Sequence, residues 1–83
     1  MKNMFSLEAC RKNAGLTLRQ AASYAGISYQ TLSKYENNSA DIPISLLNKL
    51  VFLYQVDKDL IFLGNKYELI RKIKEKRQKK KAS

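Results

Sequence analysis

The sequence predicts an all-α fold: a compact five-helix domain followed by a basic, partly helical segment. Its 83 residues are enough for one modest core, since a chain of this size buries roughly 60–65% of its unfolded surface. Three Gly and one Pro provide few of the breaks that hairpins need. Apolar residues recur at helical spacing, and no stretch alternates with the two-residue period of a strand.

Charge divides the chain at residue 64. The formal charge is +9; residues 1–64 hold seven Lys or Arg and five acids, whereas residues 65–83 hold nine Lys or Arg and two acids. We therefore expect a domain over residues 1–64 and a basic tail over 65–83. Such a tail favours a polyanion, either a nucleic acid or an anionic membrane surface, although it can also serve solubility alone.

Several classes of protein are excluded by composition. A single cysteine, Cys10, rules out an intramolecular disulfide, and the absence of His removes His-based metal sites and general bases. No apolar run reaches the ~20 residues of a membrane span, and Glu8 comes too early for a signal peptide. We expect a cytoplasmic protein that is not an enzyme and has no cofactor, metal, membrane partner or small-molecule substrate.

The first two helices are expected over residues 4–14 and 18–25. The first has Leu7, Cys10 and Ala14 at helical spacing, and it is expected to end at Ala14-Gly15, where Gly15 can adopt the left-handed conformation. The second follows a capping box, with Thr17 three residues before Gln20. Its apolar positions are Leu18, Ala21, Ala22 and Ala25.

A third helix is predicted over residues 29–37, capped by Ser28, with Leu32 and Tyr35 inward. Residues 37–41 then form a polar loop. A fourth helix starts near Asp41, with Pro43 in its first turn. A fifth spans 58–63, and the tail is helical from residue 66 and frays towards residues 79–81 because like charges repel. Most aromatic side chains are expected at core or rim positions: Phe5, Tyr24, Phe52, Tyr54, Phe62 and Tyr67.

The second and third helices carry a recognisable arrangement. Ala22 is small enough for two helices to cross closely, Gly26 permits a positive φ in the turn, and Leu32 fills the core from the later helix. This is the helix-turn-helix pattern, in which the second helix of the pair lies in the major groove of DNA.

Residues 7–64 resemble the Cro/C1-type (Xre-like) helix-turn-helix family, which has the lambda-repressor-like fold. The resemblance is carried by Leu7, Arg11, residues 15–17, Ala22, residues 26–28, 31–34, 36–37 and 42–44, Leu47, residues 54–57 and 59–60. Three positions depart from the pattern. Asn38 replaces a usual Gly, although Asn tolerates the left-handed conformation. Ala21 replaces a larger aliphatic residue, and Leu18 replaces a Gln that many members place on a phosphate.

The outward face of the third helix supplies the expected base contacts: Tyr29, Gln30, Ser33 and Lys34. Gln can pair with adenine and Lys with guanine. The resemblance favours Tyr29 and Gln30 for bases and leaves Lys34 to a base or a phosphate; a merely solvated polar face is the alternative. Expected phosphate contacts lie at helix N-termini and in the loop after the third helix: Thr17, Arg19, Ser28, Asn37 and Asn38. The resemblance also implies a structural ion pair between Arg11 and Glu36.

The leading functional prediction is a sequence-specific double-stranded DNA-binding transcription regulator. The resemblance implies a repressor from a phage, plasmid or bacterial mobile element, bound as a homodimer to a pseudo-palindromic operator. One alternative is an antitoxin or adaptor that binds another protein, with Phe62, Leu63, Tyr67, Ile70 and Ile73 available for docking. Another is general nucleic-acid or RNA binding through the tail alone.

Overall fold

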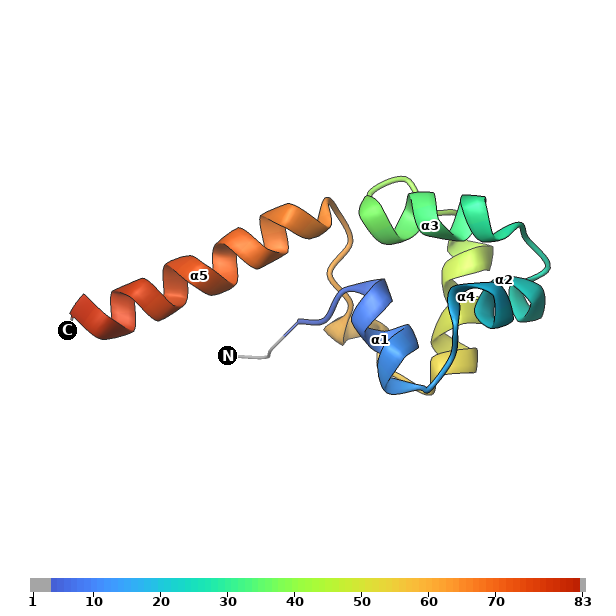
Figure 1. The fold of residues 1–83 in the computed structure, drawn as a ribbon, viewed down its shortest axis with the longest axis horizontal. Helices are drawn as coiled ribbons and strands as arrows, with labels where there is room; N and C mark the ends of the chain where they lie inside the picture. The colour runs from blue at the N-terminus through green and yellow to red at the C-terminus, as the bar shows by residue number, and fades with distance from the viewer. Residues whose placement is uncertain (1–3, 83) are drawn as a thin grey trace.

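The computed structural model describes the backbone of residues 4–82 and the side chains of residues 4–75 (Figure 1). Its elements are α1 (Leu7–Asn13), α2 (Leu18–Ala25), α3 (Tyr29–Asn37), α4 (Ile44–Tyr54), the short 3₁₀ helix η1 (Lys58–Leu60) and α5 (Lys66–Ala82). Helices α1 to α4 and η1 form the body, and the all-α prediction is confirmed. Within the described chain the extended pairing is limited to two isolated bridges.

Helix α1 is shorter than predicted. It begins at Leu7 because the Ser6 hydroxyl accepts a hydrogen bond from the Ala9 amide at 3.1 Å. Phe5 instead forms a bridge with Ile61, with its amide donating to the Leu60 carbonyl at 2.7 Å. Ala14 is the exposed C-cap of the helix and Gly15 has φ 75°, so the predicted end of α1 at these residues is confirmed.

The boundaries of α2 and α3 agree with the prediction. The capping box of Thr17 and Gln20 is present, and Ser28 caps α3 by accepting from the Thr31 amide at 3.2 Å. Between the helices Gly26 has φ 73°, the left-handed conformation that a glycine adopts without strain. The amide of Ile27 then donates to the Ala22 carbonyl at 3.0 Å, which closes the end of α2.

The second half of the body departs from the prediction at three places. Pro43 is the N-cap of α4 with extended backbone, not a residue of its first turn. The expected helix over 58–63 is only the three-residue η1, because the next residues extend to pair with Phe5: the Phe62 amide donates to the Phe5 carbonyl at 2.9 Å. The loop after α3 is not wholly polar surface, since Ser39 is buried.

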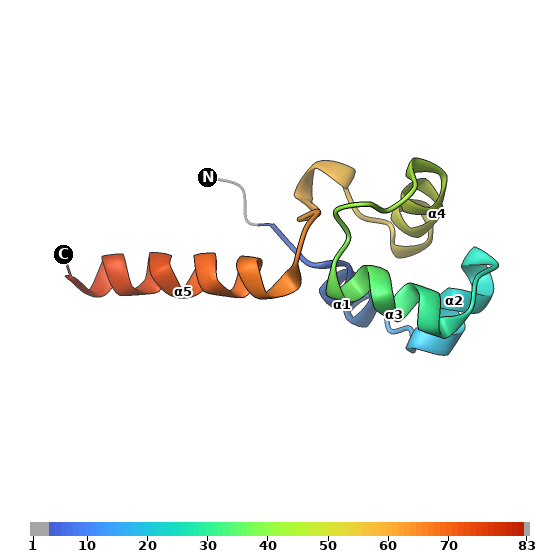
Figure 2. The ribbon, with the colours of Figure 1, turned by 90° about the horizontal axis from the view of Figure 1, so that it is seen from above.

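Helix α5 leaves the body beside the C-terminal end of α3 and projects away from it (Figures 1 and 2). Its backbone is helical to Ala82, so the predicted fraying at residues 79–81 is not found. The segment holds no Gly or Pro and consists largely of good helix formers. Among the described residues no helix has the length and apolar character required to cross a membrane.

The core lies between α1, α2, α3 and α4, with Leu32 and Leu50 fully buried at its centre. Most of the aromatic predictions are wrong. Tyr54 is buried, but Tyr24 is 73% exposed, Phe52 is 79% exposed, and Phe5 and Tyr67 are exposed as well. Three small residues of α2 are buried in the core instead: Ala21, Ala22 and Ala25.

Candidate nucleic-acid interface

Helix α3 presents a polar face to solvent. Leu32 anchors the helix in the core, and the side chains of Tyr29, Gln30 and Lys34 are exposed. Ser33 is half-buried, so it lies lower on this face than the other three. The hydrogen-bonding ends of an amide, an ammonium and a phenol are therefore available on one side of a helix that is fixed from beneath.

The structure brings Arg11 and Glu36 together beneath α3. The Arg11 Nε donates to Glu36 Oε2 at 2.7 Å and Nη2 donates to Oε1 at 3.1 Å, while Nη1 donates to the Leu16 carbonyl at 3.0 Å. Both side chains are buried, and the hydrogen bonds to Glu36 raise the pKa of the Arg11 guanidinium. The last turn of α3 is thus tied to α1 by a two-point charged contact.

The buried side chain of Tyr54 lies close enough to Arg11 and Glu36 for their charges to affect its pKa. Burial raises the pKa of Tyr54 to about 12, with a smaller contribution from the Glu36 carboxylate. Its hydroxyl has no hydrogen-bond partner among the described residues. The sequence placed Tyr54 on the apolar face of α4, but its proximity to Arg11 and Glu36 depends on how the helices pack.

The first turns of α2 and α3 expose groups that suit an anion. Thr17 Oγ1 accepts from the Gln20 amide at 3.1 Å, which leaves the hydroxyl hydrogen of Thr17 free to donate. Ser28 Oγ lies 2.8 Å from Thr31 Oγ1 and accepts from the Thr31 amide. The first-turn backbone N–H groups of a helix have no intrahelical partner, so both ends can bind phosphate.

Arg19 in the first turn of α2 contacts Tyr29 in the first turn of α3. The guanidinium carbon of Arg19 lies 4.2 Å from the centroid of the Tyr29 ring, which is cation–π stacking distance. We predicted a phosphate role for Arg19 and a base role for Tyr29, but their stacking was missed. No local sequence signal pairs two residues on different helices.

Asn37 and Asn38 are both exposed at the end of α3. The expectation that Asn38 substitutes for glycine in a left-handed turn is wrong, because it has φ −150° and ψ 110°. Its Oδ1 accepts from the Ala40 amide at 3.0 Å, and its backbone forms a bridge with Asn65. The backbone here is extended so that it can pair with the segment preceding α5.

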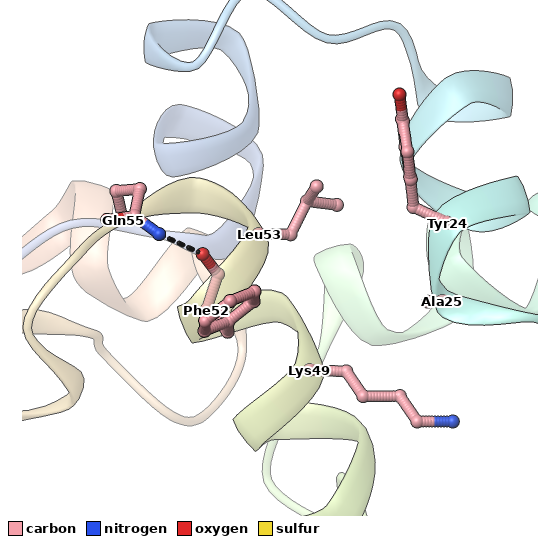
Figure 3. A pocket seen from close by; sticks show the side chains of 6 residues that line it. All are labelled: Tyr24, Ala25, Lys49, Phe52, Leu53 and Gln55. Carbon is pink, nitrogen blue, oxygen red and sulfur yellow. Dashed lines mark hydrogen bonds between the residues drawn. The ribbon is translucent and has the colours of Figure 1, made fainter.

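A second surface lies on another part of the body (Figure 3). An open groove between α2 and α4 is lined by Tyr24, Ala25, Lys49, Phe52, Leu53 and Gln55. The side-chain Nε2 of Gln55 donates to the Phe52 carbonyl at 2.7 Å, and this contact lies at the C-terminal end of α4. Helical spacing gave no sign of this groove, since Tyr24 and Phe52 were expected at core or rim positions.

Comparison with known proteins finds a match that covers the body of the molecule. The helix-turn-helix family model matches residues 7–61, a span that includes α1 to α4 and η1. No curated protein is similar enough to be matched. Within the described residues, no cluster of three or more acidic or Cys side chains is placed to hold a metal ion. With its capped helix pair and buried Arg11–Glu36 contact, the chain belongs to the Cro/C1-type helix-turn-helix family of DNA-binding regulators.

Proposed function

We propose that this protein is a sequence-specific transcription regulator that reads double-stranded DNA with α3. The observation that carries the proposal is the exposed face of α3, held in place by the buried Arg11–Glu36 contact. A helix of this width fits the major groove, where each base pair presents a distinct set of donors and acceptors. Gln30 is suited to adenine and Lys34 to guanine, whereas Tyr29 offers a ring and a hydroxyl.

Phosphate contacts fix the register of such a helix on the duplex. Thr17 and Ser28 lie at the starts of two helices whose free N–H groups favour an anion, and Arg19 adds a cation beside them. We assign Asn37 and Asn38 to the sugar-phosphate backbone at the other end of α3. Residues 1–64 then constitute the DNA-reading domain, and residues 65–83 are a separate element.

A regulator of this kind acts by occupying a DNA site at a promoter. We propose a cytoplasmic repressor from a phage, plasmid or bacterial mobile element, without enzymatic activity. It binds a pseudo-palindromic operator as a homodimer, since two copies of α3 related by a two-fold axis reach half-sites about one helical turn apart. The concentration dependence of its sedimentation, with and without operator DNA, measures this oligomeric state.

The decisive experiment is selection of bound duplexes from a random pool, followed by titration of the selected duplex and a scrambled duplex. The variant Gln30→Ala/Lys34→Ala is expected to lose the preference for the selected duplex and keep its fold. The matched control is Asn48→Ala/Lys49→Ala, which removes an amide and an ammonium from exposed positions of α4. Equal preference in both variants, or no enriched sequence with the unaltered protein, would exclude readout by α3.

A second candidate function is binding of another protein, as in an antitoxin or adaptor. The observation that favours it is the aromatic surface at the α2–α4 groove, where Phe52 and Tyr24 are the two most exposed large apolar residues among those described. Phe52→Ser would abolish a complex with a co-expressed partner and leave DNA selectivity unchanged. Gln30→Ala/Lys34→Ala would have the opposite pattern, so the two functions are separable.

A further inference from the structure

We propose that α5 is a second DNA-contacting element, which lies along the phosphate backbone next to the base pairs read by α3. This inference rests on the proposed function, because α3 defines where the duplex lies. It is carried by how the start of α5 is attached to the end of α3, by the charge of α5, and by the direction in which α5 leaves the body (Figures 1 and 2).

The start of α5 is fixed to the loop after α3. The Ser39 amide donates to the Gly64 carbonyl at 3.0 Å, and the Gly64 amide donates to Ser39 Oγ at 3.0 Å. The next residues along, Asn38 and Asn65, form an antiparallel bridge. Ser39 is buried, so these hydrogen bonds are shielded from water. The direction of α5 is therefore coupled to the C-terminal end of α3.

Further contacts hold the first turns of α5. The Lys72 ammonium lies 5.4 Å from the centroid of the Phe62 ring. Asn65 caps the beginning of the helix, with its Oδ1 accepting from the Tyr67 amide at 2.9 Å. A helix held in this way keeps its cations at a defined place relative to α3, unlike cations on a flexible linker.

Exposed cations of α5 lack ion pairs within the part of the chain whose side chains are described. Residues 66–82 contain nine Lys or Arg and two Glu, on a helix about 25 Å long. Arg71 and Lys74 are exposed, and neither forms an ion pair with a side chain in the described range 4–75. B-DNA carries about one negative charge per 1.7 Å of helix axis. A duplex therefore offers phosphates along the whole length of α5.

Two other partners fit α5 less well than a duplex. A helix that lies on a membrane needs an apolar face along its length, but the exposed apolar residues of α5 are confined to its first half: Tyr67, Ile70 and Ile73. Residues 74–82 contain no apolar residue larger than Ala82. A second copy of this basic half would be repelled by like charge.

The test uses the full chain with two or three cations neutralised in each variant. Arg71→Gln/Lys74→Gln alters exposed positions of α5, and Lys79→Gln/Lys80→Gln/Lys81→Gln alters residues further along the same helix. The control Lys49→Gln/Lys58→Gln removes two exposed cations from the body. A plot of log affinity against log salt has a negative slope, and each lost phosphate contact is expected to reduce the steepness of that slope by about 0.9. The α5 variants should therefore show a shallower slope than the control, with equal weakening on selected and scrambled duplexes.

The inference is overturned if neither α5 variant reduces the steepness of the salt dependence. It is also overturned if the control reduces it equally, since the total charge of the protein would then explain the salt dependence without a specific role for α5. It is also overturned if α5 variants lose binding to vesicles of phosphatidylserine but keep the unaltered slope on DNA. Its failure is distinguishable from that of the proposed function. Selective binding with an unchanged slope removes only the role of α5. Unselective binding that still depends on α5 removes base readout by α3 and the placement of α5 beside it, and leaves α5 as a nonspecific phosphate contact.

Discussion

Removal of one partner of the Arg11–Glu36 contact is expected to destabilise the fold severely. In Arg11→Met the aliphatic part of the side chain is kept, but two hydrogen bonds to Glu36 and one to the Leu16 carbonyl are lost. The Glu36 carboxylate, whose side chain is only 4% exposed, is then buried without a counter-charge. Breaking a buried pair in this way costs about 3–5 kcal/mol.

This loss is large against the total free energy of unfolding. At about 0.05–0.15 kcal/mol per residue, a chain of 83 residues has a stability of about 4–12 kcal/mol. Since 1 kcal/mol shifts the melting temperature of a small domain by about 4–8 °C, Arg11→Met should melt at least about 12 °C below the unaltered protein. Urea unfolding followed by far-UV circular dichroism at neutral pH measures the difference.

A surface ion pair on the same helix supplies the control. Lys12 Nζ lies 3.9 Å from Glu8 Oε1 with Lys12 well exposed, so Glu8→Gln should cost less than about 1 kcal/mol. The double variant Arg11→Met/Glu36→Leu removes both charges and should be more stable than Arg11→Met alone. A cost for Arg11→Met no greater than that of Glu8→Gln, or a double variant that costs the sum of the two single changes, would refute this explanation.

Three further predictions concern the scaffold. Tyr54→Phe should hardly change the free energy of unfolding at pH 7. As the pH rises from 10 to about 12, the unaltered protein should lose more stability than Tyr54→Phe, and this difference should be at most about 3 kcal/mol. The sign follows because the pKa of Tyr54 is raised in the fold, so the unfolded state loses its proton first as pH rises; urea titrations at several pH values test this, and parallel pH profiles would contradict it. Gly26→Ala should cost about 1–2 kcal/mol from backbone strain alone, since a methyl group there meets no atom within 4 Å; a thermal melt equal to that of the unaltered protein would argue against the strain. Thr17→Ala should cost about 1 kcal/mol in the same assay through loss of the capping box, with Thr17→Ser as the variant that retains it.

The local features of the helix pair were predictable because their parts lie within a few residues of one another. Thr17 with Gln20, the turn at Gly26 and the cap at Ser28 each depend on backbone geometry over three or four residues. Such contacts form whenever the helix forms, so the sequence identified α2 and α3 to the residue. The Arg11–Glu36 contact, by contrast, was expected only through the family resemblance.

The failures share a cause. Helical spacing shows that α4 has a broad apolar face, but it does not show which part of that face a neighbouring helix covers. Leu46, Leu47 and Leu50 are buried, whereas Phe52 on the same helix is exposed at the groove between α2 and α4. The same reasoning applies to Phe5, which pairs with Ile61 through backbone atoms that no side-chain pattern reports.

By itself, the sequence determined the helical class, the helix-turn-helix pair, its caps and the polar face of α3, since these depend on residues close together in the chain. Only the tertiary structure decided that Arg19 stacks on Tyr29, that Ser39 binds Gly64 and that α5 leaves from the end of α3. Each of these contacts joins residues 10 or more positions apart. Their formation depends on how the helices pack, and short-range spacing carries no information about that packing.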